Sequence, residues 1–162
     1  MKYLLAVIAL ALSSANDNHT TQQDLIGAWR LVDIQVQGPA GREADPFYGN
    51  GSRGLLIYDA SGWFSVQIEG ADRPAVKVPA ARPVTQISTD DSKALHSYYA
   101  YFGTWSFDPA TSTVTHHARG ALYPSEDAAI YPQQVEVVGR HMTFSRSQNG
   151  KVQKKLWERV SH

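Results

Sequence analysis

The chain contains no cysteine. This absence excludes disulfide bonds, thiolate chemistry and a lipid-modified cysteine anchor. The folded domain must therefore be stabilised by its hydrophobic core alone. Hydrophobic residues make up 43% of the 162 positions, which is ordinary for a globular protein and sufficient for one domain.

An excess of either charge is also missing. Fifteen Lys and Arg residues balance fifteen Asp and Glu residues, so the formal net charge is zero. A protein that holds nucleic acid phosphates normally carries a basic excess or a basic stripe, and neither is present. We therefore expect no nucleic acid partner.

Long hydrophobic runs are absent except at the N-terminus, where the chain begins MKYLLAVIALALSSAND. A basic Lys2, an apolar run and then small residues are typical of a secretory signal peptide, here residues 1–15. The alternative is a buried N-terminal helix. The apolar run is too short to span a bilayer, which needs about 20 residues. We expect a secreted or periplasmic protein with a flexible segment over 16–23, a domain over 24–162 and no membrane span after signal removal.

The rest of the chain alternates short β-type runs with turn residues. About eight such runs with short connections predict an all-β fold, an eight-stranded up-and-down antiparallel barrel. The predicted strands cover residues 29–37, 54–58, 63–68, 103–107, 114–122, 130–138, 141–145 and 152–160.

One segment interrupts this pattern. Residues 70–91 carry three prolines and no periodicity, which predicts a long surface loop. The following stretch SKALHSYYAYF places Leu95, Tyr98, Tyr99 and Phe102 at helical spacing, which predicts one short helix capped by Asp91 or Ser92. Such a helix would either cover the barrel mouth as a lid or support the barrel.

Two adjacent histidines stand in the run TVTHHARGALYP. Side chains alternate between the faces of a strand, so His116 shares the apolar face and His117 the polar one. Neighbours on opposite faces cannot bind one metal ion together, and the other histidines show no zinc-like spacing. We predict no metal site and an inward-facing His116.

Catalytic and cofactor motifs give no positive signal. Gly49-x-Gly51-x-x-Gly54 matches a dinucleotide-binding fingerprint, but a strand follows it where that site needs a helix. No nucleophile elbow, zinc-protease motif or phosphate-binding loop occurs. We predict no cofactor, and no catalytic residue can be assigned.

The two ends of the domain carry a stronger pattern. Gly27 and Trp29 form a G-x-W at the first strand, and Arg159 lies in the last. The first and last strands pair in a closed barrel, so this guanidinium can stack on the indole ring.

These residues make the chain resemble the lipocalin superfamily, and more specifically the bacterial lipocalin-like domain proteins. The matching runs are LIGAWRLV, RGLLIYDASGWFSVQ, SYYAYFGTW, TVTHHARGALYP and LWERV, in this order over nearly the whole chain after residue 15. The chain departs from that family after Pro124, where it lacks a tryptophan, and at Glu136, where the family tends to have arginine. The resemblance implies an eight-stranded barrel with an apolar cavity, and it implies no settled activity.

Our leading functional hypothesis is a lumen that binds a small, mainly hydrophobic molecule. Aromatic side chains combine apolar area with a polar handle, which suits such a pocket. One alternative is a cofactor-free isomerase or cyclase, with His116 as acid or base and Tyr101 or Tyr123 as donor. Another is a filled barrel that serves as an interaction module. The predicted ligand-binding residues are Tyr58, Trp63, Tyr98, Tyr101, Trp105, His116 and Tyr123.

Overall fold

The computed structural model describes residues 19–75 and 88–161. The proposed signal peptide and part of the predicted proline-rich loop therefore lie outside the described residues. Within the described part, no helix is long and apolar enough to cross a membrane.

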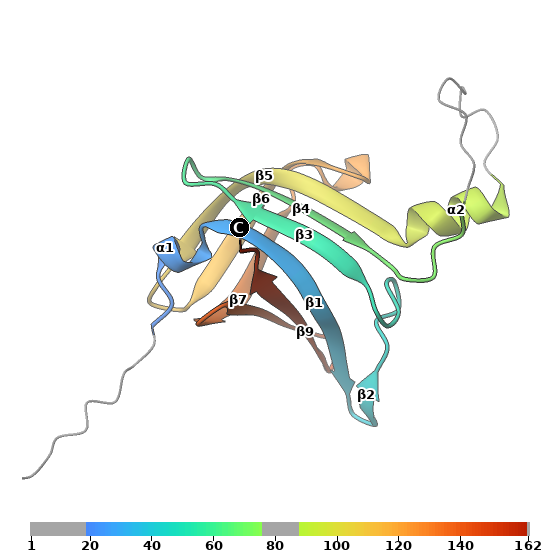
Figure 1. Ribbon diagram of the computed structural model, residues 1–162, viewed down its shortest axis with the longest axis horizontal. Coiled ribbons are helices and arrows are strands. Elements are labelled where there is room, and N and C mark those ends of the chain that lie inside the picture. The colour runs from blue at the N-terminus through green and yellow to red at the C-terminus, as the bar shows by residue number, and fades with distance from the viewer. Residues whose placement is uncertain (1–18, 76–87, 162) are drawn as a thin grey trace, which may run out of the picture.

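Nine antiparallel strands make up most of the described part of the chain, and eight of them close into a barrel (Figure 1). The barrel closes because β1 pairs with β9, while β2 is an additional short strand on the edge of β1. The predicted fold class is confirmed. The elements in order are α1 Gln22–Leu25, β1 Gly27–Gly38, β2 Gly41–Glu43, β3 Arg53–Tyr58, β4 Trp63–Glu69, α2 Thr89–His96, β5 Tyr98–Asp108, β6 Thr113–Ala121, the 3₁₀ turn Pro124–Glu126, β7 Ile130–Val138, β8 His141–Gln148 and β9 Lys151–Arg159.

Alternation along each strand builds the core. On β4, Phe64, Val66 and Ile68 are buried, and the residues between them are less so. On β1 the register shifts between Leu31 and Asp33, so that the buried positions continue from Leu31 to Ile34 across a bulge. One face of each of these strands therefore lines the barrel interior.

The two ends of the barrel differ. At one end the strands are joined by tight turns, at 59–62, 109–112 and 139–140, and α1 packs there. The indole Nε1 of Trp29 donates a hydrogen bond to the carbonyl of Leu25 at 2.8 Å, and both residues are fully buried. The segment before α1 is packed as well, because the hydroxyl of Thr20 accepts a 2.9 Å hydrogen bond from the backbone of Val137. We call this end the closed end.

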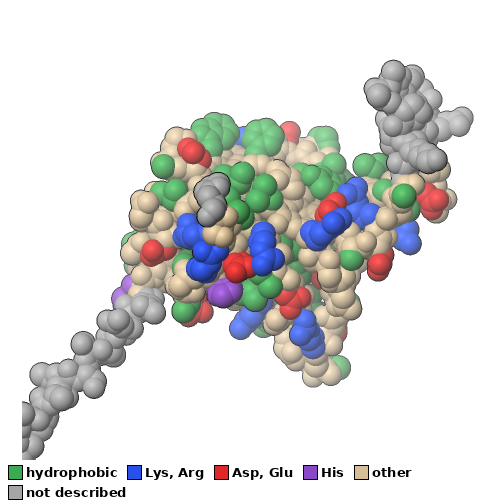
Figure 2. Space-filling view, viewed as in Figure 1, with side chains coloured by type: hydrophobic (Ala, Val, Ile, Leu, Met, Phe, Trp, Pro, Cys, Tyr) green, Lys and Arg blue, Asp and Glu red, His purple; other side chains and the backbone are tan. Residues whose placement is uncertain are grey.

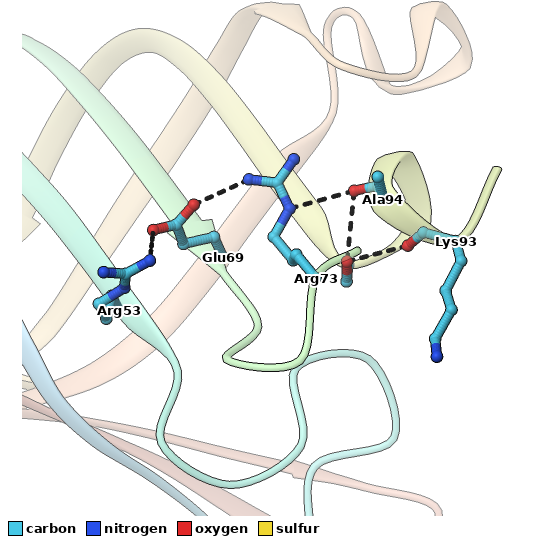
Figure 3. A network of polar contacts seen from close by, with 6 residues as sticks. Arg53, Glu69, Arg73, Lys93 and Ala94 are labelled. Carbon is cyan, nitrogen blue, oxygen red and sulfur yellow. Dashed lines mark hydrogen bonds and ion pairs between the residues drawn. The ribbon is translucent and has the colours of Figure 1, made fainter. Parts of the chain in front are cut away.

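Longer connections gather at the opposite end, which we call the open end. They include residues 39–52, the segment around α2 and residues 122–129 (Figure 1). Ion pairs hold part of this end together: Glu69 pairs with Arg53 and with Arg73, each at 2.8 Å. Arg73 also donates to the carbonyl of Ala94 in α2, as Figure 3 shows. This network anchors α2 beside the open end.

The predicted helix over 92–102 is correct only in its first half. Helix α2 ends at His96, and its N-cap is Ser88, which forms a capping box with Asp91. Tyr98–Phe102 belongs to β5 instead, because these residues pair with β4, as in Tyr101 opposite Val66. Strand pairing with a buried neighbour outweighs helical spacing here.

Apolar side chains also occupy part of the outer surface. Hydrophobic side chains gather along the upper side of the molecule in Figure 2, over the region of β3, β4 and β5. Three exposed large side chains that lie together form this outer apolar patch: Ile57, Trp63 and Phe102.

Candidate functional site

The barrel encloses a cavity of about 640 Å³ that extends to the open end. Its lining includes the exposed residue Phe47 and the turn residue Asn149, so the cavity communicates with solvent there. This volume lies within the ~300–1,000 Å³ that small-molecule sites usually occupy.

The wall formed by β3 and β4 is apolar. Leu56, Val66 and Ile68 line it, and each is at most 4% exposed to solvent. Val36 on β1 and Phe144 on β8 extend the apolar surface. A hydrophobic molecule that covered these side chains would be stabilised by about 25 cal/mol for each Å² of apolar area removed from water.

The wall formed by β8 and β9 is mixed: besides Phe144 and Trp157 it carries the cations Arg146, Lys151 and Lys155. Lys151 forms an ion pair with Glu43 at the rim. Arg146 and Lys155, farther along the same wall, make no ion pair or hydrogen bond to any residue that the structure describes. Burial lowers the pKa of Lys155, and the charge of Arg146 contributes to the lowering, while Asp45 opposes it.

Carboxylates of the cavity lining are engaged elsewhere. Asp45 accepts hydrogen bonds from the backbone of Phe47 and Tyr48, at 2.9 and 3.0 Å, and from Gln153 at 2.6 Å. Glu126 accepts from the hydroxyl of Tyr99. The unpaired cations of the wall are therefore not neutralised by a direct contact among the described residues.

Tyrosine is the most frequent side chain of the lining. Burial raises the pKa of Tyr99, and also that of Tyr101, where nearby tyrosines and Glu126 add to the effect. Both hydroxyls therefore keep their protons at neutral pH and can act as hydrogen-bond donors. The six tyrosines are Tyr48, Tyr98, Tyr99, Tyr101, Tyr123 and Tyr131.

His116 lies on the cavity wall and is 1% exposed. Its ring stacks on Phe64 with centroids 4.1 Å apart. Nε2 is hydrogen-bonded to the hydroxyl of Tyr58, and Nδ1 to the hydroxyl of Tyr101 at 2.7 Å. Burial lowers the pKa of His116 to about 3, and the nearby charge of Lys155 contributes. The imidazole is therefore neutral near pH 7.

This geometry bears on the isomerase or cyclase alternative. Both ring nitrogens of His116 are occupied by tyrosine hydroxyls, so neither is available to take a proton from a bound molecule. A group with a pKa of about 3 is also a poor general acid or base near neutral pH. The arrangement does not favour proton transfer through this histidine.

The structure brings together four of the seven predicted ligand-binding residues. Tyr98, Tyr101, His116 and Tyr123 line the cavity. The other three do not, and they lie nearer the closed end. Tyr58 is buried behind His116, and the buried Trp105 packs on it with centroids 4.7 Å apart. Trp63 belongs to the outer patch and is 49% exposed, so a ligand in the cavity would not touch it.

Arg159 in the last strand contacts Trp29 and the segment that leads into the first strand. The guanidinium of Arg159 lies 4.1 Å from the centroid of the Trp29 ring and donates to the carbonyls of Ile26 and Asp24, at 2.7 and 2.5 Å. Gly27 is required beside it, because its φ is +133° and an added Cβ would lie 2.7 Å from Nη1 of Arg159.

Sequence reasoning missed Arg146 and Lys155. A signal was available, since counting back by twos from the buried Trp157 places Lys155 and Gln153 on the inner face. Within the two described ranges, no three His, Asp or Glu side chains are grouped in a way that could hold a metal ion.

A closed eight-stranded barrel with a lumen cavity and a Trp–Arg stack at its closed end defines a lipocalin-type protein. A model of the lipocalin-like domain matches residues 26–159, and the chain belongs to this family. No curated protein sequence matches the chain.

Solved structures with a similar fold include a mutant of the fluorescent protein UnaG, with 13% identity, a TM-score of 0.41, and coverage of 86% of this chain and 99% of that one. A REP1-NXSQ fatty acid transporter has 13% identity and a TM-score of 0.39, with coverage of 86% of this chain and 98% of that one. Secretory abundant heat soluble protein 4 from Ramazzottius varieornatus has 13% identity and a TM-score of 0.43, with coverage of 88% of this chain and 99% of that one. At these identities and TM-scores, the ligands of those proteins are not transferred to this chain.

Proposed function

We propose that this protein binds a small, mainly hydrophobic molecule in the lumen of its barrel. The observation that carries the proposal is the cavity of about 640 Å³, with Leu56, Val66 and Ile68 on one wall. A filled barrel would offer no such space, so the cavity favours binding over a purely structural role. We further propose export before binding, which the composition of residues 1–15 supports.

A neutral solvatochromic dye, Nile red, tests the binding proposal. We expect its fluorescence to rise and shift to the blue on addition of the protein, with saturation near one dye per barrel. Ile68→Trp places a larger side chain in the lumen and should weaken binding. Gln67→Trp is the matched control, because neighbouring residues of β4 face opposite sides of the sheet.

The outer apolar patch is the competing site for the dye. Phe102→Gln removes one of its side chains and should leave the dye signal unchanged. Equal binding by the Ile68→Trp and Gln67→Trp proteins, or loss of the signal in Phe102→Gln alone, would place the dye outside the lumen and contradict the proposal.

A further inference from the structure

The hydrogen-bond chain from Tyr58 through His116 to Tyr101 has a direction. Because His116 is neutral, one ring nitrogen carries a hydrogen and the other accepts one. One tyrosine must therefore donate to the ring, and the other must accept from it. The direction depends on whether each hydroxyl has another hydrogen-bond partner.

Tyr58 has no alternative partner. It is 1% exposed, and His116 is the only residue in the described part of the chain that its hydroxyl contacts by a hydrogen bond. If it accepted from the ring, its own hydrogen would stay buried and unbonded, which is costly. Tyr58 therefore donates to Nε2, and Nδ1 carries the hydrogen that is donated to the Tyr101 oxygen, 2.7 Å away.

The hydroxyl hydrogen of Tyr101 remains unused in this arrangement. Tyr101 lines the cavity, and His116 is the only hydrogen-bond partner of its hydroxyl in the described chain. Donors that are already accepting a hydrogen bond donate more strongly, since the bonds of a chain polarise one another. Tyr101 thus presents a donor to the lumen.

Arg146 and Lys155 line the same cavity as this donor. The charge of Arg146 partly offsets the raised pKa of Tyr101, and the charge of Lys155 contributes to the lowered pKa of His116. The carboxylates of Glu126 and Asp45 act there too, on Tyr101 and on Lys155 respectively. In the strand order of the barrel, β9 with Lys155 stands across the lumen from β5 with Tyr101. The Arg146 guanidinium, the Lys155 amine, whose protonated form a bound anion would stabilise, and the Tyr101 hydroxyl form a site that complements an oxyanion.

We propose that the ligand is amphipathic and ends in a carboxylate, with its oxygens held by Lys155, Arg146 and the Tyr101 hydroxyl and its apolar part on Leu56, Val66 and Ile68. This proposal rests on the lumen binding proposed above and specifies the class of ligand. Tyr58 and His116 act as positioning residues, which free the Tyr101 hydrogen and do not need to touch the ligand.

Displacement of Nile red by two compounds of equal chain length tests the proposal. Dodecanoate and dodecan-1-ol, both below micelle-forming concentrations, differ only in the head group. We expect dodecanoate to displace the dye at a concentration roughly tenfold or more below that of the alcohol, as charge-assisted hydrogen bonds imply. Equal displacement by the two compounds would overturn the carboxylate site while leaving lumen binding intact. No binding of Nile red would instead contradict the proposed function itself.

Single substitutions then test which side chains cause the preference for dodecanoate over the alcohol. Lys155→Met and Arg146→Met should each reduce the ratio of the two displacing concentrations several-fold, while Lys154→Met, on the outer face of β9, should preserve it. Retention of the full ratio in both inner variants would overturn the assignment of these cations.

Tyr58→Phe separates a positioning role from a structural one. Without the Tyr58 donor, the Nδ1–H tautomer is no longer stabilised over the other, so in part of the molecules the ring accepts from Tyr101, which then has no free hydrogen. We expect a lower carboxylate preference with unchanged affinity for Nile red, and no additional loss when Tyr58→Phe is combined with Tyr101→Phe. An undiminished carboxylate preference in Tyr58→Phe, or fully additive losses in the double variant, would overturn the positioning role of the Tyr58–His116–Tyr101 hydrogen bonds.

Discussion

The guanidinium of Arg159 lies 4.1 Å from the ring centroid of Trp29, although 129 residues separate them in the sequence. The same guanidinium donates to two carbonyls of the segment that leads into β1. One side chain of the last strand therefore fixes the start of the first strand and closes the barrel.

Replacing Arg159 by Met should destabilise the fold strongly. It removes a cation–π contact and leaves two carbonyls without donors, so we expect the free energy of unfolding to fall by about 2–4 kcal/mol. Urea denaturation measures the change. Arg30→Met is the control, because Arg30 forms an exposed ion pair with Glu158, which is usually worth less than about 1 kcal/mol. Similar losses in both variants would contradict the special role of Arg159.

Acid should destabilise the protein through His116. Its pKa is lowered from 6.5 to about 3 in the folded state, so between these values the unfolded chain binds one more proton than the folded one. Stability is then present above about pH 6.5 and is lost as the pH falls toward 3, with a total effect on the order of 5 kcal/mol. Stability measured from pH 7 to pH 4 should fall less steeply in His116→Gln than in the wild type.

His141→Gln is the control for this pH dependence. It removes an exposed histidine of β8 and should leave the wild-type slope unchanged. A wild-type slope in His116→Gln would show that other groups cause the acid sensitivity.

The tautomer of His116 is directly measurable. Long-range ¹H–¹⁵N correlation spectra of the labelled protein should show the hydrogen on Nδ1, since Tyr58 donates to Nε2. In Tyr58→Phe, where this donor is absent, we expect the hydrogen to be shared between Nδ1 and Nε2, so that both tautomers are populated. A wild-type ring with its hydrogen on Nε2 would contradict the direction of the hydrogen-bond chain.

Export with removal of the signal peptide would shorten the protein, so the proposal can be tested by measuring its mass. Expression of the full chain in a bacterium should yield a periplasmic product that begins near Asn16, since residues 1–15 match a cleavable signal. Intact-mass measurement of the periplasmic and cytoplasmic fractions provides the check. A full-length product confined to the cytoplasm would contradict the prediction.

Several structural features were accessible from sequence because they depend on local periodicity. The alternation Val114, His116, Ala118 predicts an inward histidine, and the three residues are at most 2% exposed. The same reasoning failed at Tyr98–Phe102, where the spacing fits a helix as well as a strand. Pairing with β4 decided between them, and pairing is not a local property.

The site was only partly predictable. Aromatic composition indicated a pocket, but it did not distinguish Tyr101, which lines the lumen, from Trp63, which faces solvent. A cation in a strand usually faces water, but the parity of Lys155 with the buried Trp157 turns it inward.

The sequence by itself determined the strand pattern, the inward face of most strands and the meeting of Trp29 with Arg159, because a pleated strand repeats every two residues and an up-and-down barrel joins its first strand to its last. Only the tertiary structure decided that the lumen is hollow and that Arg146 and Lys155 are left without partners among the described residues. The physical reason is that a cavity depends on the summed volumes of side chains from every strand around the barrel, and an ion pair depends on which of those strands face one another.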